Sequence, residues 1–354
     1  MNQYSELKKA LQPHLGWHGA RVSFLALFLL ALLKVRTVNL SEIAVGMEGK
    51  AVYSSKYKRL QRFFRGFELD YTVIAKIVVK WMEIPQPWVL SLDRTTWKCG
   101  SKYHNILALG IVNQGVAFPV LEWMLPKKGN SNSDERMRFI EEFLKIFPDA
   151  HIRCLCGDRE FIGQAWVRYL MLSPSMAFRV RIRETDKIQR QGKYLASKVV
   201  FAHLKAGQSQ QLKGVCRVWG LHVAVEALRL EDGKLLVIVS PVGTTDSIAD
   251  YQKRWGIETL FGIFKSRGFR LESTHLRDPE RLHKLFAVLT LALCWSFKTC
   301  LLLHQFHPIL LKKHGRRAKS IFRLGLDHLR HLILNPCSAN YPEFLRSLQL
   351  LSCT

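Results

Sequence analysis

The stretch YQKRWGIETLFGIFK, residues 251–265, combines charged and apolar side chains at regular spacings. Its polar landmarks are Tyr251, Arg254, Glu258 and Lys265. In one α-helix, at about 100° per residue, these four side chains fall within a stripe roughly 60° wide. The apolar side chains fall beside this stripe, so one helix is expected to hold a carboxylate and its neighbouring cations at the margin of a buried core. A solvated ladder of ion pairs is the alternative interpretation.

Two apolar runs upstream of this stretch also lead to carboxylates. Residues 88–93 end in Asp93, and residues 152–156 are followed by Gly157 and Asp158. Such runs predict buried strands, and polar side chains at strand ends in an α/β domain gather at one edge of the sheet. A turn or helix cap is the alternative role for each Asp. Glu160 is a rival carboxylate that is expected to open the next helix.

The spacing of Tyr, Arg, Glu and Lys resembles the Y-R-E-K motif of bacterial insertion-sequence transposases of the IS-four type, a group of DDE transposases. Residues 91–96 (SLDRTT) and 156–161 (CGDREF) resemble the first and second Asp motifs of that family. The resemblance extends over roughly residues 55–330, with the three motifs in the family's order. It implies an α/β fold: a ribonuclease H-like catalytic core with a β-rich insertion, flanked by helical N- and C-terminal regions.

The resemblance also implies a catalytic and metal-binding role for three carboxylates, those of Asp93, Asp158 and Glu258. They would hold two Mg²⁺ (or Mn²⁺) ions per active site, because hard cations prefer oxygen ligands. Two such ions roughly 4 Å apart stabilise the attacking and leaving oxygens of phosphoryl transfer.

The remaining residues of the motif are implied to bind DNA. Arg254 and Lys265 would contact the scissile phosphate or the DNA backbone, and Tyr251 would position the backbone or a base, with structural ion pairing as the alternative. Family members often stack an insertion aromatic on a base displaced from the duplex. Leu235 stands where that Trp is expected, and Trp219 is the nearest alternative, although core packing also suits it.

Composition agrees with a nucleic-acid partner. The 354 residues include 53 Lys and Arg against 28 Asp and Glu, a net charge of +25, and 48% of them are hydrophobic. Such a chain can bury a core, and its charge favours a polyanion over a small-molecule substrate. The eight Cys have no C-x-x-C pair and no zinc spacing, which indicates reduced thiols. The apolar stretches 22–33 and 285–297 are shorter than the ~20 residues that cross a bilayer, so buried helices and no membrane are expected.

Changes in sequence texture, together with what the resemblance implies, divide the chain into five expected parts. These are a helical DNA-binding domain (1–80), the first part of the ribonuclease H-like core (81–172), a β-rich insertion (173–245), the catalytic helix with the rest of the core (246–304), and a basic helical C-terminal region (305–354).

Basic side chains mark the expected DNA contacts at both ends of the chain. Residues 1–80 hold 13 Lys and Arg against 5 Asp and Glu and are helix-turn-helix-like in outline. The expected contacts are Lys58, Arg59 and Arg62 in a helix over residues 56–65, and Arg316 and Arg317 in the cluster 314–319. A solvated amphipathic helix is the alternative for residues 56–65.

These features together predict a DNA transposase that cleaves transposon ends with metal ions and transfers the strands into target DNA by a cut-and-paste route. Its expected partner is double-stranded DNA, which it would bind as a homodimer in the bacterial cytoplasm, associated with the nucleoid. Two alternatives stay open: a non-catalytic protein that binds transposon ends, and a nuclease that cleaves without joining.

Overall fold

The chain forms two compact units in the computed structural model, which describes residues 2–173, 176–306, 308–313, 315 and 317–351. The helical unit contains the residues up to Glu83, Thr96–His104 and the chain from Phe261 onward. The sheet unit contains Ile84–Thr95 and Asn105–Leu260. Residues from the two ends of the chain therefore belong to the same unit.

The helical unit is built from eight α-helices within the described residues. They are α1 (Gln3–Leu15), α2 (Gly19–Val35), α3 (Leu40–Gly46), α4 (Tyr53–Gly66), α5 (Tyr71–Met82), α11 (Pro279–Phe306), α12 (Ile321–Leu334) and α13 (Tyr341–Gln349), with a π turn (Ile263–Arg267) and a 3-10 turn (Leu271–Ser273) before α11. Helix α11 packs against α2, α4, α5, α12 and α13. Gly325 lets α12 approach closely, because a Cβ there would lie 1.7 Å from the carbonyl oxygen of Ser296.

The apolar helices of this unit are buried, as predicted for residues 22–33 and 285–297. By length and composition α11 could cross a membrane, with a mean hydropathy of 1.9 in its most apolar window, but 89% of that window is buried inside the fold. Helices α2 and α3 pass the same test as a pair that is bent by 103°. Helices that are apolar on every side are expected in the core of a large unit.

In the part of the chain that the structure describes, the sheet unit is built on eleven strands, two of which have residues that belong to the helical unit. The strands are β1 (Trp88–Cys99), β2 (Lys102–Asn113), β3 (Val116–Met124), β4 (Ile152–Gly157), β5 (Phe178–Arg181), β6 (Lys187–Arg190), β7 (Lys193–Ala196), β8 (Ser209–Gln211), β9 (Cys216–Val218), β10 (Leu221–Arg229) and β11 (Leu235–Ser240). Their order is β3-β2-β1-β4-β5-β11-β10-β9-β6-β7, with β8 beside β10. Strand β4 is parallel to β1 and to β5, whereas the pairs β2–β3, β5–β11, β11–β10, β10–β8, β10–β9, β9–β6 and β6–β7 are antiparallel.

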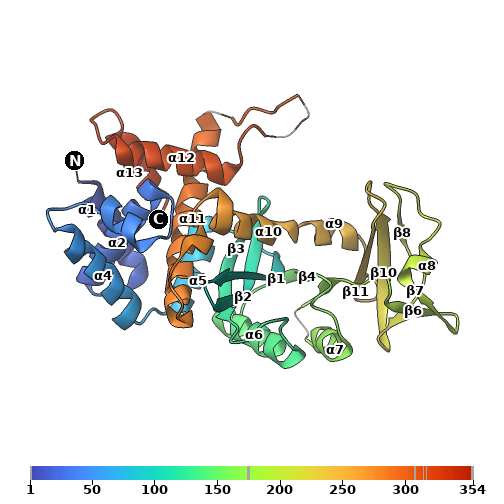
Figure 1. Ribbon diagram of the computed structural model, residues 1–354. Coiled ribbons are helices and arrows are strands. Elements are labelled where there is room, and N and C mark those ends of the chain that lie inside the picture. The colour runs from blue at the N-terminus through green and yellow to red at the C-terminus, as the bar shows by residue number, and fades with distance from the viewer. Residues whose placement is uncertain (1, 174–175, 307, 314, 316, 352–354) are drawn as a thin grey trace. The chain divides into compact units, whose positions relative to one another are not determined.

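The sheet continues from the expected core into the expected insertion. Strand β5 pairs with β4 on one side and with β11 on the other, so residues beyond 173 extend the same sheet. Helices α6 (Ser133–Ile146) and α7 (Gln164–Leu172) lie on one face, and α9 (Ser247–Gln252) and α10 (Trp255–Gly262) on the other, with the short α8 (Ser197–Val200) near β7 (Figure 1).

The prediction of a single helix over residues 251–265 is wrong. Helix α9 ends at Gln252, α10 begins at Trp255, and a π turn follows α10. The two helices are held at different places: Asp250 of α9 pairs with arginines on β4 and β5, whereas Gly256 of α10 lies against the β2–β3 hairpin. Tyr251 therefore comes from a different helix than Glu258.

Two helix starts differ from expectation. Helix α4 begins at Tyr53, before the expected start at residue 56. Helix α7 begins at Gln164, so Glu160 lies in a turn and does not open a helix. Helix α6 begins with a capping box between Asn132 and Glu135.

Candidate active site

Asp93 and Asp158 lie at the same edge of the sheet. Strand β1 continues to Cys99, beyond the predicted end, but its parallel pairing with β4 ends where Leu92 meets Gly157. Each aspartate directly follows the last paired residue of its strand. The buried runs before them fix both strands in the core, because every residue from Trp88 to Leu92 is buried.

The carboxylate of Asp93 is largely buried, with 17% of its side chain exposed. It accepts hydrogen bonds from the backbone N–H of Arg94 at 2.7 Å and from Nη1 of Arg254 at 3.0 Å. The pKa of Asp93 is raised to about 6, mainly by burial; the charges of Glu160 and Asp158 act in the same direction, and Arg254 acts against them. A carboxyl group with this pKa favours a cation beside it at neutral pH.

Arg254 connects two of the predicted carboxylates. Its guanidinium donates to Asp93 and, through Nη2, to Glu258, while its Nε has no hydrogen-bond partner among the described residues. Only 7% of the Arg254 side chain is exposed. Burial by itself would lower the pKa of Arg254, but the charges of Tyr251 and the nearby carboxylates outweigh it and raise the pKa. Arg254 is thus ion-paired here, as in the alternative interpretation of this residue.

Tyr251 links the third carboxylate to this group. Its hydroxyl donates to Oδ1 of Asp158 at 3.3 Å, and the guanidinium of Arg254 lies 5.5 Å from the centre of its ring. Nη1 of Arg181 lies 3.9 Å from the same Asp158 oxygen. Burial raises the pKa of Tyr251, so its hydroxyl stays protonated and can donate at any ordinary pH.

Lys265 is the member of the motif that belongs to the helical unit. Its ammonium group donates to the carbonyl oxygen of Thr96 at 2.9 Å, pairs with Glu272 at 2.8 Å and lies 5.7 Å from the ring centre of Trp97. These contacts hold Lys265 beside the outer end of β1.

The rival carboxylate Glu160 is engaged by Arg94. Two guanidinium nitrogens of Arg94 donate to the two Glu160 oxygens, each at 3.2 Å. The buried Arg136 fixes the same turn, because it donates to the carbonyl oxygens of Glu160 and Ile162. Sequence reasoning missed Arg136, although an Arg on the apolar face of an amphipathic helix is a signal for a buried role.

The expected DNA contacts outside the Tyr251–Lys265 motif lie at the surface of the helical unit. Lys58 and Arg62 on α4 are exposed, Arg59 is half-buried, and Arg317 is exposed before α12. Arg316 lies outside the described residues.

Neither of the two insertion positions considered for base stacking, Leu235 and Trp219, is fully exposed. Leu235 is buried in β11, and Trp219 is half-buried with its Nε1 donating to Asp186 at 3.4 Å. Trp255, which the sequence reading did not single out, is 66% exposed directly after Arg254. An exposed indole beside ion-paired carboxylates is a surface on which a base could stack.

The three predicted carboxylates have the ligand chemistry that a divalent metal ion needs, but they are not arranged around one common metal position. Oxygen donors suit Mg²⁺ or Mn²⁺. Within the described part of the chain, however, no group of three or more His, Cys, Asp or Glu side chains lies close enough to hold a metal ion. Arg254 supplies the positive charge between Asp93 and Glu258 instead.

Comparison with known proteins places these residues in a family. A solved structure that aligns with the chain is the piggyBac transposase synaptic complex with hairpin DNA, with a TM-score of 0.48 and 11% identity over 98% of this chain and 79% of that chain. No curated protein matches the chain. Residues 84–295, more than half of the chain, match the model of the transposase DDE domain, and they include Asp93, Asp158 and Glu258. The chain therefore belongs to the transposase DDE domain family.

Proposed function

We propose that this transposase cleaves the ends of a mobile DNA element by a metal-dependent reaction and transfers the freed strands into target DNA. One observation carries the proposal: Asp93 and Asp158 follow adjacent parallel strands, and Arg254 joins Glu258 to Asp93. The family match supports the transposase class. The IS-four type, the ribonuclease H-like core and the cut-and-paste route belong to the same proposal and rest on the motif spacing.

In this mechanism Asp93, Asp158 and Glu258 would hold Mg²⁺ or Mn²⁺, which when bound polarises the phosphate and activates the attacking oxygen. Arg254 neutralises the carboxylates until then and must release at least one of them. A released guanidinium can pair with a phosphate through two parallel hydrogen bonds. Tyr251 keeps Asp158 oriented through its hydroxyl.

The charge distribution supports DNA as the partner. The exposed cations of α4 and the exposed Arg317 suit the phosphate backbone, which is read mainly by Lys and Arg. Because two ends must be held together for transfer, the protein is proposed to act as a homodimer on double-stranded DNA. Its proposed location is the bacterial cytoplasm, associated with the nucleoid.

The test uses linear DNA that carries the gene with its flanking sequence, incubated with the protein and Mg²⁺ or Mn²⁺. Wild-type protein should cut at the element ends and form joined products. Asp93→Asn, Asp158→Asn and Glu258→Gln should each abolish both, whereas the exposed controls Asp149→Asn and Glu141→Gln should not. Unchanged cleavage in any one of the three active-site variants would contradict the assignment.

A second candidate, a protein that binds element ends without cutting them, is favoured by one observation. Arg254 already satisfies the charge of two carboxylates, and within the described residues no metal-holding group is formed. That function predicts DNA binding with a steep salt dependence but no product with any divalent metal ion. A nuclease without transfer would give cut ends and no joined strands.

A further inference from the structure

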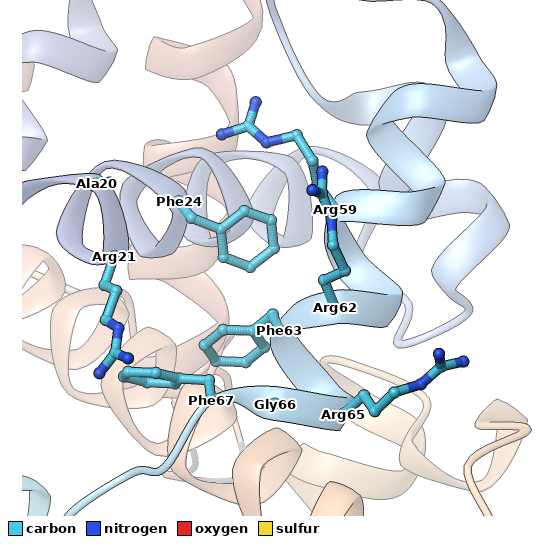
Figure 2. Close-up of a pocket in the computed structure, with 9 residues that line it drawn as sticks. All are labelled: Ala20, Arg21, Phe24, Arg59, Arg62, Phe63, Arg65, Gly66 and Phe67. Atoms are coloured by element: carbon cyan, nitrogen blue, oxygen red, sulfur yellow. The ribbon is translucent and has the colours of Figure 1, made fainter.

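The helical unit contains a pocket of about 550 Å³ in which aromatic rings are surrounded by arginines. It lies between α2 and α4, and Figure 2 shows its rings with Arg21 on one side and Arg59 and Arg62 on the other, whereas the side chain of Arg65 points away from the rings. Its lining residues are Ala20, Arg21, Phe24, Arg59, Arg62, Phe63, Arg65, Gly66 and Phe67. The volume lies within the roughly 300–1,000 Å³ of small-molecule sites.

Three phenylalanines form the floor. Phe63 lies 5.1 Å from Phe67, ring centre to ring centre, with the ring planes 28° apart, and 5.1 Å from Phe24 with the planes 35° apart. Phe63 and Phe67 are thus stacked and Phe24 is tilted against Phe63, and the three rings together form an aromatic platform. Each keeps 5–8% of its surface exposed, so the platform is fixed by packing but still reached from the pocket. Aromatic side chains at the base of a pocket are suited to a planar ring as the ligand.

Four arginines form the rim, and none makes an ion pair within the described residues. Arg59, Arg62 and Arg65 repeat every three residues on α4, and Arg21 faces them from α2. Among the described residues that line the pocket, none is acidic. Near the active site, by contrast, Arg94 and Arg254 pair with carboxylates. The unneutralised guanidinium groups of Arg21, Arg59 and Arg62 beside the rings favour an anionic ligand.

The arginines and the rings already act together. The guanidinium carbon of Arg21 lies 4.8 Å from the ring centre of Phe67, and that of Arg59 lies 5.7 Å from the ring centre of Phe24. Each of these guanidinium groups lies within cation–π range of a ring, so an arginine and an aromatic ring border the same part of the pocket and can contact one planar anionic group together.

We propose that this pocket binds an unpaired nucleotide of DNA, with its base on the phenylalanine platform and its phosphates on the arginine rim. The inference rests on the proposed function only in taking DNA as the ligand. A free phosphate would use the rim and leave the platform unused, and paired bases inside a duplex expose no face to it. Base stacking on aromatic side chains tolerates any sequence. The pocket thus selects single-stranded DNA next to a duplex over the duplex alone.

The test measures binding of the full chain in EDTA, where no metal-dependent cleavage occurs. The probes are a blunt duplex and the same duplex with a three-nucleotide overhang containing 2-aminopurine. The overhang should tighten binding about tenfold, in line with the contribution of one stacked base, and the 2-aminopurine fluorescence should be quenched. Equal affinity for both probes, or unchanged fluorescence, would overturn the proposal.

Matched variants locate the effect in the pocket. Arg21→Gln and Arg59→Gln should remove most of the preference for the overhang, whereas Lys76→Gln, which removes an exposed charge on α5, should keep it. Phe67→Leu should weaken quenching without a large loss of duplex binding, with thermal melting to show that it folds. Displacement of the probe by inorganic phosphate as readily as by a deoxynucleotide, or by polyglutamate more readily than by single-stranded DNA, would also overturn the proposal.

Cleavage assays separate this inference from the proposed function. If the protein prefers the overhang but does not cleave DNA, the proposed function is contradicted and the nucleotide pocket is supported. If it cleaves DNA but shows no preference for the overhang, the nucleotide pocket is contradicted and the proposed function is supported.

Discussion

Nη1 of Arg254 donates to Oδ2 of Asp93 at 3.0 Å, and the other terminal nitrogen of the same guanidinium donates to Glu258. Two residues expected to hold a metal ion thus share an internal cation. Asp93 is buried and has a raised pKa, so it requires this charge when no metal is bound. Arg254 can therefore act as a substitute counter-ion that a metal ion must displace.

Replacing Arg254 with Ala should destabilise the metal-free protein by about 3–5 kcal/mol, because it leaves the buried carboxylate of Asp93 without a partner. Urea denaturation measures this loss. Added Mn²⁺ should restore more stability to the variant than to the wild-type protein, since the competing cation is absent.

The control for this prediction is Arg323→Ala, which removes a partly exposed pair with Asp327 and should cost no more than about 1 kcal/mol. Equal losses in the two variants would show that the Arg254 pair carries no special burial cost.

The pH dependence of stability should reveal Asp93. Its pKa rises from 3.8 to about 6 on folding, so folding favours the protonated form. The stabilising contribution of this group is therefore complete below pH 3.8 and is lost as the pH rises through 6. The loss amounts to about 3 kcal/mol, at ~1.4 kcal/mol per unit of pKa.

The measurement is urea denaturation of metal-free wild type and Asp93→Asn between pH 4 and 8. The variant should gain stability relative to the wild-type protein as the pH rises through 6. A difference that does not change with pH would mean that Asp93 titrates at its ordinary pKa.

Gly256→Ala should weaken the attachment of α10 to the hairpin. A Cβ at this position would lie 3.0 Å from the backbone nitrogen of Ala117 and 3.1 Å from the carbonyl carbon of Val116. Because backbone atoms cannot yield, α10 must shift, with a loss of about 1–3 kcal/mol and of cleavage activity through Glu258.

The matched control is Gly262→Ala on the same helix, where the nearest atoms belong to the flexible end of Arg267. Denaturation and cleavage assays on both variants compare the two sites. A milder effect at Gly256 than at Gly262 would show that close packing on the hairpin does not position Glu258.

Trp255→Ala should reduce cleavage without reducing stability. The indole is 66% exposed, so little burial is lost, but a base stacked on it would lose roughly 1–3 kcal/mol of binding. Tyr194→Ala, an equally exposed aromatic on β7, provides the control. If both variants cleave DNA at the wild-type rate, Trp255 does not contact the substrate during cleavage.

The sequence predicts this site where local pattern determines position. Apolar runs that end in Asp93 and Asp158 mark two buried strands, and the parallel pairing of β1 with β4 then places both residues at one edge. These features depend on neighbours along the chain.

The parts that could not be predicted depend on contacts between distant residues. The break at Lys253 follows from separate attachments of α9 and α10, through Asp250 and Gly256, to strands far away in the sequence. A helical wheel gives the direction of Arg254 but not its partner, so its burial against Asp93 could not be predicted. The continuation of the sheet from β4 through β5 to β11 is long-range for the same reason.

The most direct test of the account compares DNA cleavage by single and double carboxylate variants. Residues that act as one site give non-additive losses. Asp93→Asn and Glu258→Gln are each expected to lower the cleavage rate by at least ~10³, and the double variant should be no slower than either single one, in keeping with the behaviour of catalytic groups that act as a unit. Losses that multiply in the double variant, or a near-wild-type rate in Glu258→Gln, would contradict a shared active site.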